Sequence, residues 1–320
     1  MKITILDDYQ NIIKDLKSFA LLKGQDVQIL HHSEKEPERL AEKLSDTDIL
    51  VLTRERTVIN EELLSLLPSL KLISQTGKIS KHLDLASCTK HNVLVAEGVG
   101  SPIAPAELTW ALIMNTVRKL PQAIEGMKAG KWQTNIGGTV YGKTVGIWGY
   151  GKIGHRIAQY AKAFEADVLV WGSEKSRQKA FDDGFIPALT KEEFFETANI
   201  ITLHLRLNEN TYGIVKKSDL TMMKENSALI NTARAELIEK GALLTALKTG
   251  RPALAGIDVY EQEPIYDENY ELLKMSNVVC TPHLGYVERS SYELYFGKAF
   301  ENVINYLNGS PTNIANKEIL

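Results

Sequence analysis

Residues 144–154 read TVGIWGYGKIG, and the fold follows from this stretch. Thr144–Trp148 has the apolar, β-branched character of a buried strand. Gly149–Gly154 then places three glycines at the spacing G-x-G-x-x-G, and Ile153 and Ile157 begin the apolar stripe of an amphipathic helix. Three glycines at this spacing also occur by chance, but a strand before them and a helix after them form the context that the motif requires. The stretch therefore predicts the first strand–turn–helix unit of a doubly wound α/β sheet.

Each glycine of this turn has a physical role in binding a dinucleotide. Gly149 allows the tight turn, Gly151 lets the backbone approach a pyrophosphate, and Gly154 lets the helix pack closely on the strand. The helix begins here, so its first N–H groups have no partner within the helix and can bind phosphate oxygens. A glycine-rich turn without a ligand is the structural alternative.

The end of the next strand should read the ribose of the dinucleotide, about 20 residues after the glycines. The sequence there is VLVWGSEKSR, with Gly172 and Ser173 at the place where an acidic residue would bind the ribose 2′-hydroxyl. Glu174 lies just beyond, and Lys175 and Arg177 follow. A hydroxyl and two cations would tolerate a 2′-phosphate, so both NAD and NADP remain open. A solvated charged loop is the simpler explanation of these residues.

Strand and helix patterns alternate along two parts of the chain. Between Thr144 and Pro282, the strand candidates are Thr144–Gly149, Val168–Trp171, Asn199–Leu205, Ser227–Ala233, Ala253–Val259 and Asn277–Pro282. The first part contains four more, Lys2–Leu6, Asp26–Leu30, Asp48–Leu52 and Leu70–Ser74. Alternation with short connections predicts parallel sheets. The predicted fold class is α/β, with two Rossmann-like or flavodoxin-like domains that each contain a doubly wound parallel sheet.

A strongly apolar helix near the end of the chain suggests how the domains are connected. Ser290 and Glu293 predict a capping box at its start, and Gly309 predicts its end. Its apolar stripe needs a partner, and we expect the first domain to supply it; the members of this stripe are Leu294, Phe300, Val303 and Leu307. The alternative, that this helix completes the second domain, stays open.

The predicted domain organisation is an insertion. A cofactor domain, residues 111–286, interrupts a substrate domain formed by residues 1–110 and 287–320. The crossings near Ser101–Pro105 and Tyr286–Ser290 are then hinge candidates.

Three segments of the second sheet place a reactive side chain just after a strand. INTARAEL contains Arg234, GIDVYEQEP contains Asp258 and Glu263, and CTPHLGY contains His283. Ligands of open α/β sheets bind beyond the carboxyl ends of the strands, so these residues are expected to converge. Arg234 would bind a substrate carboxylate and polarise the adjacent carbonyl, and His283 would donate a proton to the carbonyl oxygen. Glu263 would hold the imidazole and favour its protonated form. Taken singly, each residue also has an ordinary structural explanation.

The segments GYGKIG, NTARAEL, GIDVYEQEP and TPHLGY, in this order and spacing, resemble the signatures of the D-isomer-specific 2-hydroxyacid dehydrogenases. The resemblance covers nearly the whole chain. It implies hydride transfer between NAD or NADP and a small D-2-hydroxy acid or its 2-keto partner, catalysed by Arg234, Glu263 and His283. The candidate cofactor-binding residues are Gly149, Tyr150, Gly151, Lys152, Ile153, Gly154, Gly172, Ser173, Thr76, His204, Leu205, Thr232, Ala233, Asp258 and Gly285. The candidate substrate-binding residues are Gly77, Lys78, Arg54, Arg56 and Arg234.

Several positions depart from the family pattern. Gly172 replaces the acidic ribose ligand, and Arg206 stands where a proline is common after the fourth strand of the cofactor domain. The loop after Gly77 reads KISKHLDL, which differs from the commoner acidic, Asn-containing loop. The substrate is therefore left open among 3-phosphoglycerate, glyoxylate and hydroxypyruvate. We expect one catalytic subunit without a regulatory extension.

Two other functions share this fold. Formate dehydrogenases resemble the family but lack the carboxylate partner of the histidine, so Glu263 argues against that activity. Transcriptional corepressors that sense dinucleotides also resemble the family, but they carry long flanking segments, and we expect no tail of that kind here.

Composition excludes other classes of protein. The 37 Lys and Arg residues nearly balance the 40 Asp and Glu residues, so nothing in the charge favours nucleic acid or an anionic membrane as a partner. No run approaches the length of a membrane-spanning helix, and the start of the chain does not resemble a signal peptide. Two cysteines suit a reducing compartment, so we expect a cytoplasmic enzyme and, from the family, a homodimer. No metal site is predicted, because His31 and His32 have no further ligand at metal spacing.

Overall fold

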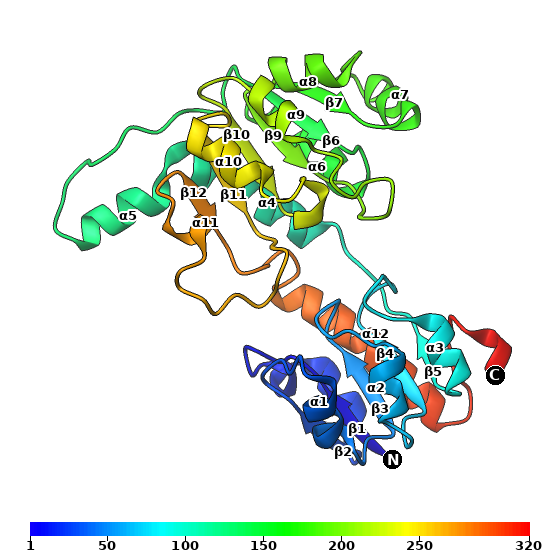
Figure 1. The fold of residues 1–320 in the computed structure, drawn as a ribbon. Helices are drawn as coiled ribbons and strands as arrows, with labels where there is room; N and C mark the ends of the chain where they lie inside the picture. Colours follow the sequence, from blue (N-terminus) through cyan, green and yellow to red (C-terminus); the bar gives the residue numbers. More distant parts are fainter. The chain divides into compact units, whose positions relative to one another are not determined.

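A computed structural model describes all residues from 1 to 320 and divides into two compact units. Unit 1 contains Met1–Ser101 and Glu288–Leu320, and unit 2 contains Pro102–Val287 (Figure 1). The predicted boundary after residue 110 falls inside helix α4 (Ile103–Arg118), whereas the structure divides the chain before this helix. The reason is that α4 buries Leu112 and Ile113 in a core cluster of unit 2, so the whole helix belongs there.

Unit 1 is built on a five-stranded parallel sheet with the order β2-β1-β3-β4-β5. Its strands are β1 (Lys2–Ile5), β2 (Asp26–Ile29), β3 (Ile49–Leu52), β4 (Leu72–Gln75) and β5 (Leu94–Ala96). Its helices are η1 (Ile13–Asp15), η2 (Lys17–Leu22), α1 (Pro37–Leu44), α2 (Glu61–Ser65), α3 (Leu85–Lys90), α12 (Arg289–Leu307) and η4 (Lys317–Ile319). All four residues of β3 are buried, as expected for a central parallel strand covered on both faces.

Helix α12 belongs to unit 1, where the ring of Phe300 packs edge-on against Phe19 at 6.0 Å between centroids. The predicted stripe is partly wrong, because Leu294 is 46% exposed, while Phe296 and Val303 are buried beside Phe300. The buried residues of the helix are Ser291, Tyr292, Tyr295, Phe296, Ala299, Phe300, Asn302 and Val303. The helix ends as predicted, with Gly309 at φ +73° after the last turn.

The predicted capping box of α12 is wrong. Glu288 is the N-cap, and its carboxylate accepts hydrogen bonds from the backbone N–H groups of Ser290 and Ser291 at 2.6 and 2.9 Å. Glu293 instead accepts from the backbone N–H groups of Lys17 and Ser18 at 2.7 and 2.9 Å. Glu288 accepts hydrogen bonds from the first N–H groups of α12, so the carboxylate of Glu293 can instead connect η2 to the helix.

Unit 2 contains a seven-stranded parallel sheet with the order β12-β11-β10-β9-β6-β7-β8. Its strands are β6 (Thr144–Trp148), β7 (Asp167–Trp171), β8 (Ile186–Pro187), β9 (Ile200–Leu203), β10 (Ala228–Asn231), β11 (Leu254–Ile257) and β12 (Val278–Cys280). The other helices are α5 (Leu120–Lys128), α6 (Lys152–Ala163), α7 (Glu174–Asp182), α8 (Lys191–Thr197), α9 (Lys217–Met222), η3 (Ala235–Leu237), α10 (Ala242–Thr249) and α11 (Glu271–Lys274). The predicted α/β class with two doubly wound parallel sheets is confirmed.

Two core clusters cover the faces of this sheet. On one face α4 and α6 pack on the sheet around Ile113, Ile147 and Ile157. On the other, α8, α9 and α10 enclose Phe194 and Phe195, whose rings meet Trp148 edge-on at 6.1 and 5.8 Å between centroids. The sheet is therefore covered on both faces, and its carboxyl edge is where side chains are expected to meet a ligand. None of the helices is both long and apolar enough to cross a membrane.

Candidate active site

The glycine turn of unit 2 lies where the strand order reverses. Gly149 has φ +101°, its N–H donates to the carbonyl of Trp171 at 2.9 Å, and an added Cβ would lie 2.7 Å from the carbonyl oxygen of His204. Trp171 ends β7 and His204 follows β9, which are the two neighbours of β6. This is the topological switch point of the sheet, the place where open α/β sheets bind their ligands. Both the conformation and the close approach require glycine at position 149.

The other two glycines differ in what surrounds them. A Cβ on Gly154 would lie 2.1 Å from the carbonyl oxygen of Gly149, so the packing of α6 on the turn excludes any side chain. A Cβ on Gly151 would meet nothing within 4 Å, and Gly151 is the N-cap of α6. The start of α6 is therefore open at the point where a pyrophosphate would bind to the N–H groups of the first turn, including those of Lys152 and Ile153. These residues fit a bound dinucleotide.

Tyr150 contributes to this turn from inside the protein. Its side chain is 3% exposed, and its hydroxyl donates to the Asp183 carboxylate at 2.9 Å and contacts Nδ1 of His155 at 3.0 Å. Burial raises the pKa of Tyr150, so the phenol stays protonated. Only its backbone remains to contact a cofactor.

The first two positions after β7, Gly172 and Ser173, carry no carboxylate. Gly172 has φ +150°, and Ser173 is the N-cap of α7, accepting a hydrogen bond from the N–H of Ser176 at 3.3 Å. The guanidinium of Arg177 lies 5.0 Å from the ring centre of Trp171 and donates to the carbonyl of Ala188 at 3.3 Å. Arg177 is thus held against the sheet, whereas Lys175 is exposed.

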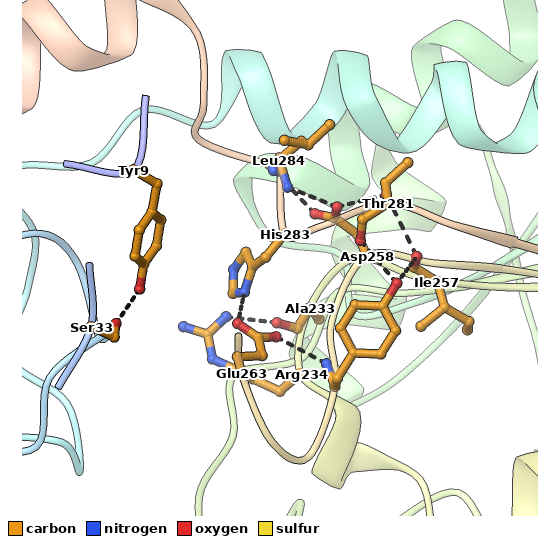
Figure 2. A network of polar contacts seen from close by, with 12 residues as sticks. Tyr9, Ser33, Ala233, Arg234, Ile257, Asp258, Glu263, Thr281, His283 and Leu284 are labelled. Carbon is orange, nitrogen blue, oxygen red and sulfur yellow. Dashed lines mark hydrogen bonds and ion pairs between the residues drawn. The ribbon is translucent and has the colours of Figure 1, made fainter. Parts of the chain in front are cut away.

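His283 and Glu263 form a direct pair. Nδ1 of His283 lies 2.6 Å from Oε2 of Glu263, and Oε1 of Glu263 accepts from the N–H of Tyr260 at 2.9 Å (Figure 2). Both side chains are largely buried, and His283 has φ +51°, a strained value typical of residues held for function. The carboxylate occupies Nδ1, so proton exchange with a substrate falls to Nε2.

Arg234 follows β10 and lies beside this pair in Figure 2. Its Nη1 donates to the carbonyl of Ala233 at 2.6 Å. Asn231, at the end of β10, braces the same loop: its side chain donates to the carbonyl of Arg234 at 2.8 Å and accepts from the N–H of Ala233 at 3.0 Å. Sequence analysis did not single out Asn231, although an amide side chain at the last position of a buried strand was a usable signal.

Asp258 connects the loops after β11 and β12. It is fully buried, and its carboxylate accepts from the N–H groups of Leu284 and Gly285 at 2.8 and 3.0 Å and from the hydroxyl of Thr281 at 2.7 Å. Burial outweighs these donors and raises the pKa of Asp258. The Asp258 carboxylate already accepts three hydrogen bonds from the protein, so its role is to position the loop that contains His283. We predicted that Asp258 contacts the cofactor directly, but none of its atoms is exposed.

The remaining predicted cofactor residues of unit 2 lie along the same edge. The hydroxyl of Thr232 contacts that of Thr109 at 2.6 Å, and Nε2 of His204 contacts the hydroxyl of Thr202 at 3.0 Å. Burial lowers the pKa of His204 to about 3, so its imidazole is neutral. Leu205 packs on the core of unit 2.

The predicted substrate residues of unit 1 gather at the ends of β3 and β4. Thr76 is buried; its hydroxyl accepts from the N–H of Arg54 and donates to the carbonyl of Leu52, both at 2.8 Å. A Cβ on Gly77 would lie 2.0 Å from Nη1 of Arg54, so the guanidinium lies directly against the Gly77 backbone. Thr76 therefore holds the backbone of Arg54 in place. We predicted that Thr76 contacts the cofactor, but its hydroxyl is buried and bonded to the protein.

The other two basic residues of unit 1 are placed differently. The ammonium of Lys78 forms an ion pair with Glu97 at 2.7 Å, and Arg56 is half-buried after β3. Arg54 is the basic residue that the structure brings together with Gly77.

Two other reactive groups have ordinary explanations. Burial raises the pKa of the Cys280 thiol, so the cysteine is protonated and not a nucleophile paired with His283. Groups of three or more His, Cys, Asp or Glu side chains with the geometry of a metal site are absent from the structure.

Comparison with known proteins identifies the family. The model of the D-isomer specific 2-hydroxyacid dehydrogenase, NAD binding domain, matches residues 110–285. The chain belongs to this family of nicotinamide-dependent oxidoreductases. The matched residues lie within unit 2, so the glycine turn is part of its NAD-binding domain.

Relatives extend the similarity to both units. The chain is 36% identical to D-3-phosphoglycerate dehydrogenase of Bacillus subtilis strain 168 over 82% of its own length, but it spans only 50% of that protein. It is 33% identical to glyoxylate reductase of Thermococcus litoralis, with 88% and 87% of the two chains covered. A crystal structure of a putative D-3-phosphoglycerate dehydrogenase from Ralstonia solanacearum superimposes with a TM-score of 0.97 at 46% identity, covering 100% of this chain and 98% of that one.

Proposed function

We propose that this chain is an NAD(P)-dependent dehydrogenase or reductase that interconverts a small D-2-hydroxy acid and its 2-keto acid. The observation that carries the proposal is the 2.6 Å contact between His283 and Glu263 at the edge of the sheet that contains the glycine turn. A histidine locked by a carboxylate is a proton donor and acceptor of fixed tautomer, and dinucleotide chemistry at a carbonyl needs one.

Three side chains divide the work on the substrate. When bound, the nicotinamide exchanges a hydride with the C2 atom of the substrate. Arg234 binds the substrate carboxylate and polarises the C2 oxygen with its forked donors. During reduction Nε2 of His283 gives a proton to that oxygen, and during oxidation it removes the proton. Glu263 orients the ring and balances the charge of its protonated form.

The names of the relatives support the proposed substrate class. Enzymes for 3-phosphoglycerate and for glyoxylate are both among the relatives, so the acid is small. On unit 1, the guanidinium of Arg54 lies against the Gly77 backbone and is a second group of the kind that binds a carboxylate. Either NAD or NADP fits the end of β7, because Gly172 and Ser173 bring no carboxylate to repel a 2′-phosphate.

Removing the imidazole tests the assignment. His283→Ala should lower kcat/KM for every 2-keto acid turned over by at least about a hundredfold, the usual range for a general acid. Binding of NADH, followed by its fluorescence, should persist. A matched control is His91→Ala, which removes a histidine that pairs with Glu61 on unit 1. Turnover by His283→Ala at the wild-type rate would refute the proposed role. The substrates are glyoxylate, hydroxypyruvate and its phosphate ester, each assayed with NADH and with NADPH.

A homodimer in the cytoplasm is part of the proposal. Helix α5 buries no side chain of its own, and Trp132 and Ile136 in the loop after it are 75% and 90% exposed. Apolar side chains exposed together are typical of an interface between proteins. Converting both Trp132 and Ile136 to Asp should halve the mass measured by light scattering; an unchanged mass would place any interface elsewhere.

A further inference from the structure

Unit 2 contains a cavity that the proposed catalytic residues do not line. Its volume is about 520 Å³, and its walls come from the loop after β10, the start of α10, the loop after β11 and helix α11 (Figure 1). Arg234, Asp258, Glu263 and His283 are not among its lining residues. Every lining residue lies within Pro102–Val287, so the cavity belongs to unit 2 alone.

The walls of this cavity are mostly apolar. Ile257 and Val259 are each 2% exposed, and the half-buried ring of Tyr270 adds an aromatic face. Apolar cavities of roughly 300–1,000 Å³ with a few polar groups are typical of small-molecule sites. The cavity therefore has the volume and the lining that suit a compact aromatic body. The aliphatic lining residues are Ile238, Leu243, Leu244, Ile257, Val259 and Leu272.

Two stretches of the lining adjoin the loops that carry the proposed catalytic residues. Asn231 is the buried polar residue of the lining, 1% exposed, and its side chain donates to the carbonyl of Arg234 at 2.8 Å. On the other wall, the lining residues Val259, Glu261 and Gln262 come shortly before Glu263 in the chain. A molecule in the cavity would therefore contact both loops from the side that faces away from the substrate.

Tyr260 gives the second of these loops a direct connection to the catalytic pair. Its N–H donates to Oε1 of Glu263 at 2.9 Å, and its hydroxyl donates to the carbonyl of Thr281, two residues before His283, at 3.0 Å. Val259 and Glu261, on either side of Tyr260, both line the cavity. A molecule that packs on these two residues acts on the Tyr260 backbone between them, and so on the carboxylate that holds His283.

The rim of the cavity carries more negative than positive charge. Glu239, Glu261 and Lys240 are exposed rim residues. Oε2 of Glu239 accepts from the backbone N–H of Lys217 at 3.0 Å, and Oε2 of Glu261 accepts from the hydroxyl of Tyr270 at 3.2 Å. Both donors are neutral groups, so the two carboxylates keep their charge. A third carboxylate at the rim, Glu271, is paired with Lys248. The rim therefore favours a cation over an anion.

We propose that this cavity is a regulatory site for a small aromatic amine. The aromatic body fills the space between α10 and the loop after β11, and the protonated amine lies at the rim beside Glu239 and Glu261. Occupancy moves the backbone around Tyr260 and thereby changes the Glu263–His283 pair. Regulation rests on the proposed function, whereas binding of the amine does not.

Three probes that share one ring system test binding and the choice of charge. Tryptamine carries an ammonium, indole is uncharged and indole-3-acetate carries a carboxylate. Calorimetric titration should give a dissociation constant for tryptamine below about 1 mM, with indole weaker and indole-3-acetate weakest. The order should be the same with NADH at saturation, because the cavity is separate from the glycine turn. Binding of indole-3-acetate as tight as that of tryptamine, or loss of tryptamine binding when NADH is present, would contradict the proposal.

Two matched pairs of variants locate the site. Leu244→Trp places a large side chain in the cavity and should abolish tryptamine binding, whereas Leu273→Trp, on α11 but outside the lining, should retain it. Glu261→Gln leaves the cavity open and should weaken tryptamine by about two- to fivefold without changing indole, the effect of one exposed ion pair. Glu268→Gln, in the same loop and outside the lining, is its control. Unchanged tryptamine binding in both Leu244→Trp and Glu261→Gln would overturn the site.

Turnover tests regulation separately from binding. Saturating tryptamine should change kcat/KM for the keto acid in wild type and in Leu273→Trp by about fivefold or more, the lower end of couplings between sites. The same addition should have no effect on Leu244→Trp. Tryptamine that binds in the cavity and leaves kcat/KM unchanged would overturn the regulatory role. Wild-type protein that reduces none of the keto acids would overturn the proposed function instead, while the calorimetric result for the cavity would stand by itself.

Discussion

The two units solve the same topological problem in opposite ways. Each is a parallel sheet whose strand order reverses once, between β1 and β3 in unit 1 and between β6 and β9 in unit 2. Unit 2 clears this point with glycines, whose missing side chains leave the backbone open at Gly151. Unit 1 fills it with Asp7, Arg54 and the hydroxyls around them. Topology fixes where a ligand binds, and the residues at the strand ends decide which ligand fits.

The two switch points differ in how far the backbone is accessible to a ligand. A pyrophosphate is recognised mainly by N–H groups, so unit 2 needs a bare turn followed by a helix. Unit 1 has no helix directly after β1, where the loop leads instead into the short 3₁₀ turn η1. The strand ends of unit 1 are therefore lined by side chains, and no helix begins directly after β1 to present unpaired N–H groups.

Filling the bare turn should produce the largest effect. In Gly154→Val the Cβ would lie 2.1 Å from the Gly149 carbonyl oxygen, so α6 must move away from the turn. Overpacking of this kind costs about 1–3 kcal/mol, and we expect NADH affinity to fall by about tenfold or more. Fluorescence titration of NADH measures it. Gly100→Ala is the control in unit 1, because its Cβ meets nothing within 4 Å. Equal affinities in wild type and Gly154→Val would mean that the turn does not hold the dinucleotide.

Local sequence predicted unit 2 better than unit 1, for a physical reason. Arg234, Glu263 and His283 could be grouped from sequence because the carboxyl ends of parallel strands share one edge. The hydrogen bonds from Ser33 and Thr57 to Asp7 could not be predicted in this way, because these residues meet through a strand order that no local pattern contains.

Sequence analysis also missed two short strands and mispredicted one helix cap. β5 and β8 have three and two residues, too few for any periodicity to register. The capping box of α12 failed because the choice between Glu288 and Glu293 depends on η2, which lies far away in the sequence.

A carboxylate placed at the end of β7 should change cofactor preference by a moderate amount. The conformation of Gly172, with φ +150°, strains any other residue, so Ser173 is the better position. Ser173→Asp keeps an N-cap acceptor for α7 and adds a charge that repels a 2′-phosphate and accepts from a 2′-hydroxyl. We expect the ratio of kcat/KM with NADH to that with NADPH to rise by about tenfold, the value of one charged hydrogen bond. Ser173→Asn, which caps without charge, should shift it far less. An identical change of this ratio in both variants would show that the charge at position 173 does not determine the cofactor preference.

The smallest effect concerns two carboxylates whose pKa values shift in opposite directions. In unit 1, hydrogen bonds from Lys90 and His91 lower the pKa of Glu61 to about 2, so its contribution to stability is present above the ordinary pKa near 4.5 and lost as pH falls towards 2. In unit 2, burial raises the pKa of Asp258, so its contribution is complete below the ordinary value and is lost as pH rises through the folded-state pKa. Thermal unfolding between pH 2.5 and 7, compared with Glu61→Gln and Asp258→Asn, separates the two.

The difference in Tm between wild type and Glu61→Gln should grow with pH between about 2 and 4.5, and only slightly, because the pair is exposed and screened. The difference between wild type and Asp258→Asn should shrink with rising pH, on top of a constant offset from the hydrogen bonds that Asn cannot accept. The exposed Glu209, changed to Gln, serves as the reference with a flat difference. Slopes of the same sign for both variants would mean that the three donors to Asp258 outweigh its burial. The carboxylate would then stabilise the His283 loop as an ion, as Glu61 does at the surface of unit 1.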